Sequence, residues 1–165
     1  MLKKIILRFG VFIFTLALIG SMWTFAETHE QIGLCKQNGK LELSVNEKNG
    51  VVSVFNRADG TVWCSNPEDG LNDETAVGIS KTNLMSQFVV IYKSTGLTEM
   101  TTNSYSECVV KKTVDYKQSS DGITATYRFE KTGFVIPVVY SLKDGIFSVR
   151  ILLDEIRENG SNRIL

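Results

Sequence analysis

The residues that could do acid, base or nucleophilic chemistry are few in this sequence. His29 is the only histidine among 165 residues. A Ser-His-Asp or Cys-His arrangement needs a histidine held beside its nucleophile, and a histidine-rich metal site needs several. We therefore expect no catalytic residue of this type and no such metal site, and we expect His29 to be a solvated residue near the N-terminus.

Paired carboxylates are the remaining material for general acid and base catalysis. Glycoside hydrolysis needs two carboxyl groups roughly 5 to 9.5 Å apart across a sugar. Asp154 and Glu155 are adjacent, so on a strand they would point to opposite faces. We interpret them as solvated residues at the end of a strand.

An acidic loop offers oxygen atoms of the kind that calcium prefers. Its carboxylates and amides are Asn66, Glu68, Asp69, Asn72, Asp73 and Glu74. Their spacing does not fit the EF-hand loop. We expect a polar connection with a short helical turn near residues 72–76, and neither a metal nor a cofactor.

Three cysteines follow the N-terminal segment, at Cys35, Cys64 and Cys108, and none belongs to a C-x-x-C motif. Cys64 and Cys108 both fall in predicted strands, so they are the pair available for a disulfide in an oxidising compartment. The odd count leaves one thiol over. We favour free or buried thiols and keep this disulfide as the alternative.

Aromatic side chains could bind a sugar by stacking, and Trp63 and Tyr92 are the candidates. Aromatic residues on strands more often pack against neighbours in the core. We interpret Trp63, which follows the turn at Asp59 and Gly60, as a plug at one end of the fold. Carbohydrate stacking is the alternative role for both residues.

The N-terminus has the pattern of an export signal. Residues 1–8 carry three basic residues and no acid, and residues 9–25 are apolar or small. We predict a signal peptide over residues 1–26, cleaved after Ala26. The apolar run is at the short limit for a membrane span, so an uncleaved anchor is the alternative. Either way the protein is expected to be secreted or at the cell surface, touching a membrane only through this segment.

The composition excludes two classes of function. The 18 basic residues are balanced by 18 acidic ones, without a basic cluster, whereas nucleic-acid binding needs a local excess of Lys and Arg. A catalytic (β/α)₈ barrel needs about 250 residues. We expect no nucleic-acid partner and no such barrel.

Turn dipeptides divide the rest of the chain into short strands. They are Asn38-Gly39, Asn49-Gly50, Asp59-Gly60, Asp121-Gly122 and Asp144-Gly145, and such pairs accept the positive φ of tight hairpins. Apolar residues alternate with polar ones over 41–46 and 123–130, which predicts strands with one buried face. The other predicted strands are 51–55, 61–64, 87–93, 108–117, 134–142 and 146–153.

Two segments, 88–92 and 134–140, are apolar at successive positions, which predicts strands covered on both faces. Pro137 removes a donor from the second and indicates a sheet edge or a bulge. No long segment after residue 26 has the period of a helix. We predict an all-β fold, an antiparallel β-sandwich over residues 39–165, preceded by a linker over 27–38.

The end of the chain looks like the start of a strand, because Ile164 and Leu165 follow a polar turn. Such a strand would lack its partner. We therefore expect an incomplete sandwich from a longer protein, truncated at its C-terminus, with a frayed tail as the alternative.

Three segments carry a resemblance to a known family. They are residues 60–67 (GTVWCSNP), residues 76–81 (AVGISK), and Ser86-Gln87 with Tyr92. Together they resemble the N-terminal domain of a family of large exported bacterial proteins of unknown function. That domain is in turn similar to the galactose-mutarotase-type supersandwich that precedes the barrels of several glycoside hydrolases.

The resemblance covers about residues 39–165 and implies a carbohydrate-related setting. It supplies no catalytic residue within this chain, and Cys64 and Cys108 depart from the family pattern. We expect an exported, non-catalytic β-sandwich module that supports a downstream catalytic domain. The alternatives are a stand-alone carbohydrate-binding module that binds a glycan, and the remnant of a glycoside hydrolase-like enzyme.

Overall fold

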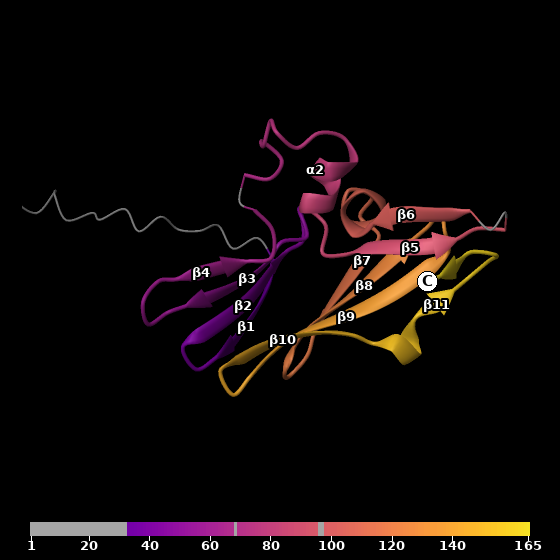
Figure 1. The fold of residues 1–165 in the computed structure, drawn as a ribbon. Coiled ribbons are helices and arrows are strands. Elements are labelled where there is room, and N and C mark those ends of the chain that lie inside the picture. Colours follow the sequence, from indigo (N-terminus) through magenta and orange to yellow (C-terminus); the bar gives the residue numbers. More distant parts are fainter. Residues whose placement is uncertain (1–32, 68, 96–97) are drawn as a thin grey trace, which may run out of the picture. The chain divides into compact units, whose positions relative to one another are not determined.

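The structure is a computed structural model that describes residues 33–67, 69–95 and 98–165. Side chains are described from residue 38 onward. The predicted signal peptide and His29 lie outside the described residues. The described part is built mainly from strands in antiparallel sheets, so the predicted all-β class is confirmed (Figure 1).

The first sheet is a four-stranded meander in the order β1-β2-β3-β4. Its strands are β1 (Gly33–Asn38), β2 (Leu41–Asn46), β3 (Val52–Asn56) and β4 (Val62–Cys64). Three of the predicted turn dipeptides join them. Gly39, Gly50 and Gly60 each adopt a positive φ, which a residue without a Cβ does at little cost.

The second sheet has the order β12-β5-β6 and contains β5 (Val89–Lys93), β6 (Glu99–Asn103) and β12 (Arg163–Ile164). β12 pairs antiparallel with β5. The expectation that the last residues form a strand is therefore confirmed, and a frayed tail is not. The expectation that this strand would lack a partner is wrong, because β5 pairs with it. Two short helical segments flank this sheet: α2 (Ile79–Leu84) and η1 (Tyr105–Val109).

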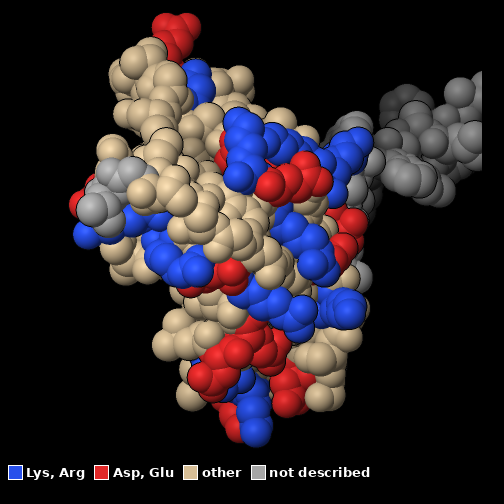
Figure 2. Space-filling view, turned by 90° about the vertical axis from the view of Figure 1, so that its right-hand side faces the viewer, with Lys and Arg blue, Asp and Glu red and all other residues tan. Residues whose placement is uncertain are grey.

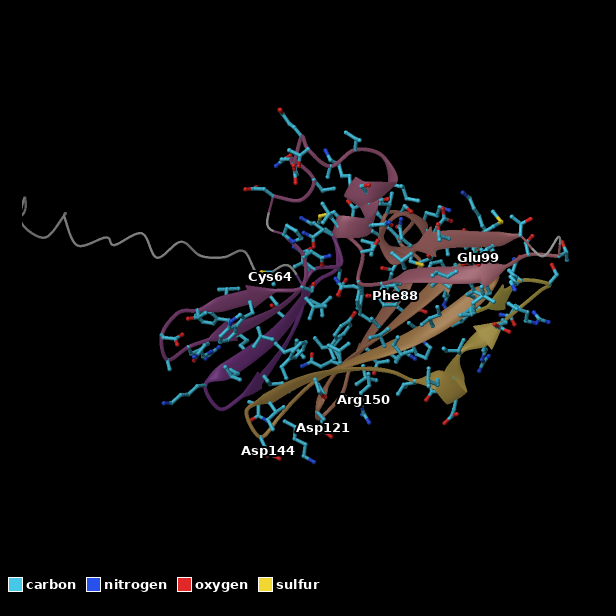
Figure 3. The ribbon with its side chains drawn as sticks, in the orientation of Figure 1. Cys64, Phe88, Glu99, Asp121, Asp144 and Arg150 are labelled. Atoms are coloured by element: carbon cyan, nitrogen blue, oxygen red, sulfur yellow. The ribbon has the colours of Figure 1, made fainter. Side chains whose placement is uncertain are left out.

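The third sheet is the largest and has the order β10-β9-β8-β7. It contains β7 (Val114–Gln118), β8 (Gly122–Phe129), β9 (Phe134–Lys143) and β10 (Ile146–Ile151). A single turn, η2 (Leu153–Glu155), leads to β11 (Arg157–Glu158), which also pairs with β9. Figure 3 shows Asp121 and Asp144 at two of the hairpin turns of this sheet.

One apolar core receives side chains from all three sheets. The alternation predicted for β8 is confirmed, because Ile123, Ala125, Tyr127 and Phe129 are all buried. Phe88 meets the Tyr127 ring edge-on at 5.0 Å, which joins the β5 segment to β8. Such edge-to-face pairs add to the stabilisation that comes from burial alone.

Pro137 lies in β9, a strand with neighbours on both sides and an unbroken register with β8, so the prediction of a sheet edge or a bulge is wrong. Its carbonyl accepts the backbone N–H of Leu152, just after β10 ends and before β11 begins. The N and C=O of one strand residue point to the same side. The missing donor therefore faces Leu152, whose carbonyl accepts the backbone N–H of Glu155 instead.

Three local predictions are wrong. Residues 33–38 form β1 and are not a linker. Residues 108–113 belong to η1 and the turn after it, so only the second half of the strand predicted over 108–117 exists. The strand β5 is covered on one face only, because Val89 and Ile91 are exposed.

Glu42 was expected on the solvent face of β2, yet only 3% of its side chain is exposed. Arg57, at the turn between β3 and β4, donates Nε to the Glu42 carboxylate at 3.0 Å and forms an ion pair with it. A buried carboxylate needs such a partner.

Lys and Arg side chains intermingle with Asp and Glu on the face drawn in Figure 2. No large patch of a single sign of charge appears on this face. Within the described residues, no helix has the length and apolar character needed to cross a membrane.

Candidate functional site

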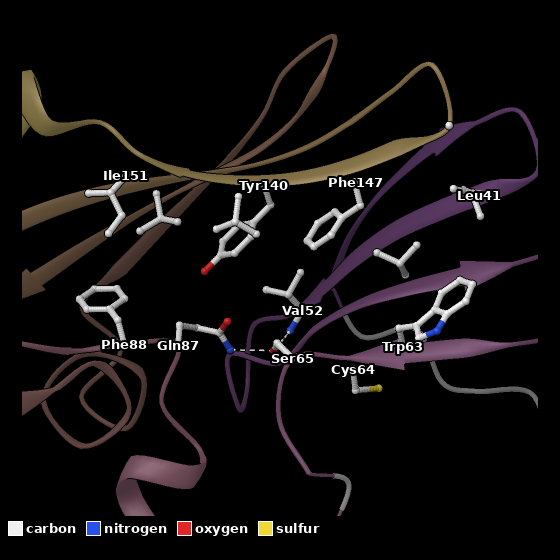
Figure 4. Close-up of a pocket in the computed structure, with 14 residues that line it drawn as sticks. Leu41, Val52, Trp63, Cys64, Ser65, Gln87, Phe88, Tyr140, Phe147 and Ile151 are labelled. Carbon is white, nitrogen blue, oxygen red and sulfur yellow. Dashed lines mark hydrogen bonds between the residues drawn. The ribbon is translucent and has the colours of Figure 1, made fainter.

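The candidate site is an open apolar groove between the first and third sheets, with a cavity volume of about 550 Å³. Figure 4 shows its two sides, with Tyr140 and Phe147 on one and Trp63, Ser65 and Gln87 on the other. None of the residues that line it carries a charge. The volume falls within the range of small-ligand pockets.

The third sheet supplies one wall. Phe147, Val149 and Ile151 alternate along β10, and each is paired with a β9 residue that faces the same way. Their exposed fractions are 38%, 52% and 46%. Alternation places all three on one face of the sheet, so this wall is an apolar surface in contact with solvent.

The first sheet supplies the other wall with Leu41, Val52, Val54 and Trp63. Val54 lies opposite Trp63 in the β3–β4 ladder, so the two side chains share a face. Trp63 is 53% exposed. The predicted plug is therefore wrong, because a plugging side chain would be buried.

A polar network closes the floor of the groove. Gln87 Nε2 lies 2.8 Å from Ser65 Oγ and 2.6 Å from Asn66 Oδ1. Asn66, which is buried, donates Nδ2 to the carbonyls of Leu84 and Ser86. The network ties the end of the first sheet to the segment between α2 and β5.

The Gln87 Oε1 atom receives no hydrogen bond from the described residues. It points from the network toward the groove (Figure 4). The floor therefore offers a bound molecule one acceptor in apolar surroundings.

Two phenols pair at the β9 wall, where Tyr140 lines the groove and Tyr127 does not. The hydroxyls of Tyr127 and Tyr140 lie 3.1 Å apart, and both residues are buried. Burial raises the pKa of Tyr140 to about 12 and raises the pKa of Tyr127 still further. Both phenols are neutral near pH 7, so they shape the wall without supplying a base.

The two aromatic candidates do not form one site. Tyr92 is 7% exposed and packs edge-on against Phe134 at 5.4 Å. Its ring therefore packs in the core and has little surface open to a sugar. Trp63 lines the groove and keeps an accessible face.

The alternative disulfide is not formed. Cys108 is a free thiol with no exposed surface in η1, while Cys64 is exposed at the end of β4. Burial raises the pKa of Cys108 to about 12. This thiol is protonated near pH 7 and inert as a nucleophile.

The acidic residues do not assemble into a site. Asp154 and Glu155 lie exposed in η2, after the strand at whose end they were predicted. Asp73 accepts both the backbone N–H and the hydroxyl of Thr75, which lowers its pKa. In the described ranges, no three His, Cys, Asp or Glu side chains come together as metal ligands would. The helical turn expected near residues 72–76 does not form; the helix in this part of the chain is α2, which begins at Ile79.

Sequence reasoning missed the β10 wall and Gln87. The signal for the wall was present, because apolar residues alternate after the turn at Asp144 and Gly145. The alternation alone does not determine whether the apolar face packs against another sheet or is exposed to solvent. The chemistry available to the finished groove is binding by apolar contact, with one polar acceptor on its floor.

No protein-family profile matches the chain, and no curated protein sequence matches it significantly.

Proposed function

We propose that this chain is an exported, non-catalytic β-sandwich module that supports another polypeptide domain in a carbohydrate-related protein. In this proposal the third sheet forms one layer, and the first and second sheets form the other. The groove is the surface on which the supported polypeptide packs.

The single observation that carries the proposal is the exposure of the apolar wall. Phe147, Val149, Ile151 and Trp63 face one opening and keep 38% to 53% of their surface in solvent. Burying apolar surface is worth about 25 cal/mol per Å². A contiguous exposed patch of this kind is typical of an interaction site.

Two further features support it. The lining carries no charged side chain that could act as a general acid or base. Ser65, Asn66, Ser86 and Gln87, which belong to the segments that resemble the exported family, also take part in one hydrogen-bond network at the groove.

The test is dye binding with a matched pair of variants. Val149→Asp places a charge on the groove wall, whereas Ile146→Asp makes the same change on the opposite face of β10, at a residue that is also exposed. We expect the folded chain to bind a hydrophobic dye, V149D to lose at least half of the fluorescence, and I146D to keep it. Equal losses would contradict a docking role for the groove.

An enzymatic control accompanies this test. Incubation with a panel of glycans is expected to release no reducing ends. Clear turnover would favour the enzyme alternative and contradict the proposal.

A carbohydrate-binding module is the second candidate, because the exposed indole of Trp63 lies in the groove. Trp23→Phe leaves Trp63 as the sole tryptophan. A saturable change in its emission with soluble glycans up to millimolar concentration would favour this candidate. No change would count against it.

A further inference from the structure

The outer edge of β10 is unpaired within the described chain. β10 is the last strand in the order of the third sheet, and β9 is its described neighbour. An edge strand presents backbone N–H and C=O groups that can pair with another strand. This edge borders the apolar groove, because three β10 side chains line it.

The hydrogen bonds between β10 and β9 identify which backbone groups of β10 point away from β9. Leu152 donates its N–H to the Pro137 carbonyl at 3.1 Å, in register with the β9–β10 ladder, so its backbone faces β9. Backbone groups along an antiparallel strand alternate in direction. The residues whose N–H and C=O point to the free edge are Phe147, Val149 and Ile151.

The same three residues present their side chains to the groove. A strand that paired with them would place its own side chains opposite theirs, on the same face of the sheet. Every second side chain of that strand would therefore pack beside the exposed apolar side chains of β10. One extended segment can satisfy the exposed backbone and bury the exposed apolar wall together.

The opposite face of β10 carries a charged residue that a paired strand would have to accommodate. Arg150 is exposed and forms no ion pair with the described residues. Figure 3 shows its position on β10. A carboxylate opposite Arg150 on a paired strand would complement it. The neutral groove, by contrast, disfavours charge at the flanking positions.

We propose that β10 and the groove bind an extended segment of a partner protein by antiparallel strand addition. The segment carries apolar residues at alternate positions and an acidic residue opposite Arg150. This inference rests on the proposed function and narrows it to one mode of docking, in which main-chain hydrogen bonds give affinity and alternate side chains give specificity.

A second copy of this chain fits the site less well. The sequence of β10 is IFSVRI, which contains no acidic residue. Two β10 strands paired around a two-fold axis would therefore leave Arg150 without a carboxylate opposite it. A partner strand with an acidic residue at that position would complement the charge of Arg150.

The probe is the peptide acetyl-KVEVTVK-amide, in which the three valines fall opposite Ile151, Val149 and Phe147 and the glutamate falls opposite Arg150. The control is acetyl-KVVVETK-amide, which has the same composition without the alternation. Both are titrated into the full chain carrying Trp23→Phe, with Trp63 emission reporting binding. We expect saturable binding of the first peptide, at least tenfold tighter than that of the second.

Amide hydrogen exchange distinguishes strand addition from nonspecific adsorption. The probe peptide should slow exchange at Phe147, Val149 and Ile151 at least tenfold while leaving Ser148 and Arg150 unchanged, because those two amides already face β9. Binding without this alternating protection would overturn the proposal.

A matched pair of variants tests the backbone contribution. Val149→Pro removes an outward N–H and no ladder donor, a position at which edge strands accept proline. Val149→Ala keeps the N–H and serves as its control. We expect V149P to weaken the peptide about tenfold more than V149A does, with both variants retaining cooperative melts; equal weakening by the two would overturn the proposal.

A charge exchange tests Arg150. Arg150→Glu should weaken the probe peptide and should instead favour acetyl-KVKVTVK-amide. An unchanged preference would overturn the assignment of the acidic position.

The outcomes separate this inference from the proposed function. If V149D loses dye binding but the alternating peptide does not bind, the supporting role stands and strand addition is overturned. Concentration-dependent dimerisation in sedimentation that V149P abolishes would assign the edge to a second copy and overturn the partner segment.

Discussion

At the scale of single residues, Gly133 shows how closely two segments of backbone meet. Its φ is +78°, and a Cβ at this position would lie 1.8 Å from the Asn159 carbonyl oxygen. Asn159 also donates its backbone N–H to the Gly133 carbonyl at 3.0 Å. Only glycine can adopt this positive φ at little cost and also leave room for the Asn159 carbonyl, without a shift of the backbone.

Gly133→Ala is therefore expected to lower the free energy of unfolding by about 3 kcal/mol, the sum of a strained φ and a backbone clash. Gly60→Ala is the matched control, because Gly60 has a φ of +77° and no atom within 4 Å of its ideal Cβ. It should cost about 1 kcal/mol. Denaturant titration measures both, and equal losses would contradict the close approach at Asn159.

The buried thiol and phenols predict sensitivity to alkali. Burial raises the pKa of Cys108 from 9.0 and that of Tyr140 from 10.0, each to about 12, and raises the pKa of Tyr127 further. Between pH 9 and 12 these groups ionise in the unfolded chain but stay protonated in the folded one. The stabilisation is complete below pH 9 and is lost as the pH rises.

We expect the free energy of unfolding to fall by at least about 2 kcal/mol from pH 8 to pH 11. Denaturant titrations at several pH values measure this. The double variant Tyr127→Phe with Tyr140→Phe should fall less steeply, because two of the ionising groups are gone. A flat profile for the unmodified chain would argue against a dry core at these positions.

At the scale of elements, Asn66 joins the first sheet to the segment between α2 and β5. It bonds the carbonyls of Leu84 and Ser86 and accepts from Gln87. Asn66→Ala removes the donor to two part-buried carbonyls and should cost about 1 to 2 kcal/mol. Asn72→Ala, in the exposed loop, should change stability by less than about 0.5 kcal/mol. Thermal and denaturant unfolding compare the two variants, and similar stability would show that the network contributes little.

Elements with a strong local signal could be predicted from the sequence. β8 alternates cleanly, and the turn at Asp144 and Gly145 gives both residues the positive φ of a tight hairpin. β1 and β6 could not be predicted, because their polar residues give no period. Pairing with β2 and β5 fixes them as strands. Tertiary pairing outweighs local propensity in such segments.

The groove was harder to predict than the strands. Alternation along β10 predicts an apolar face, but the sheet that meets this face is chosen by long-range packing. Trp63 was interpreted as a plug for the same reason, since the sequence does not show that the two sheets leave a groove at this position. The Gln87 network joins residues 65–66 with residue 87. These residues are too far apart in the sequence for a local pattern to predict their contact.

At the scale of the whole described molecule, apolar shape and not charge distinguishes the candidate site. Acidic and basic side chains mix on the face drawn in Figure 2, while the lining of the groove is neutral. Binding there should draw on buried apolar area, which salt screens little. The proposed supporting role needs this groove to be open to solvent before its partner arrives.

The accessibility of Trp63 tests that central claim most directly. In the folded chain carrying Trp23→Phe, acrylamide quenching of the remaining tryptophan reports how much of its indole faces water. An open groove predicts efficient quenching and a red-shifted emission without any ligand, consistent with the 53% exposure of Trp63. A blue-shifted emission that acrylamide cannot quench would mean that the groove is closed, and would contradict the account.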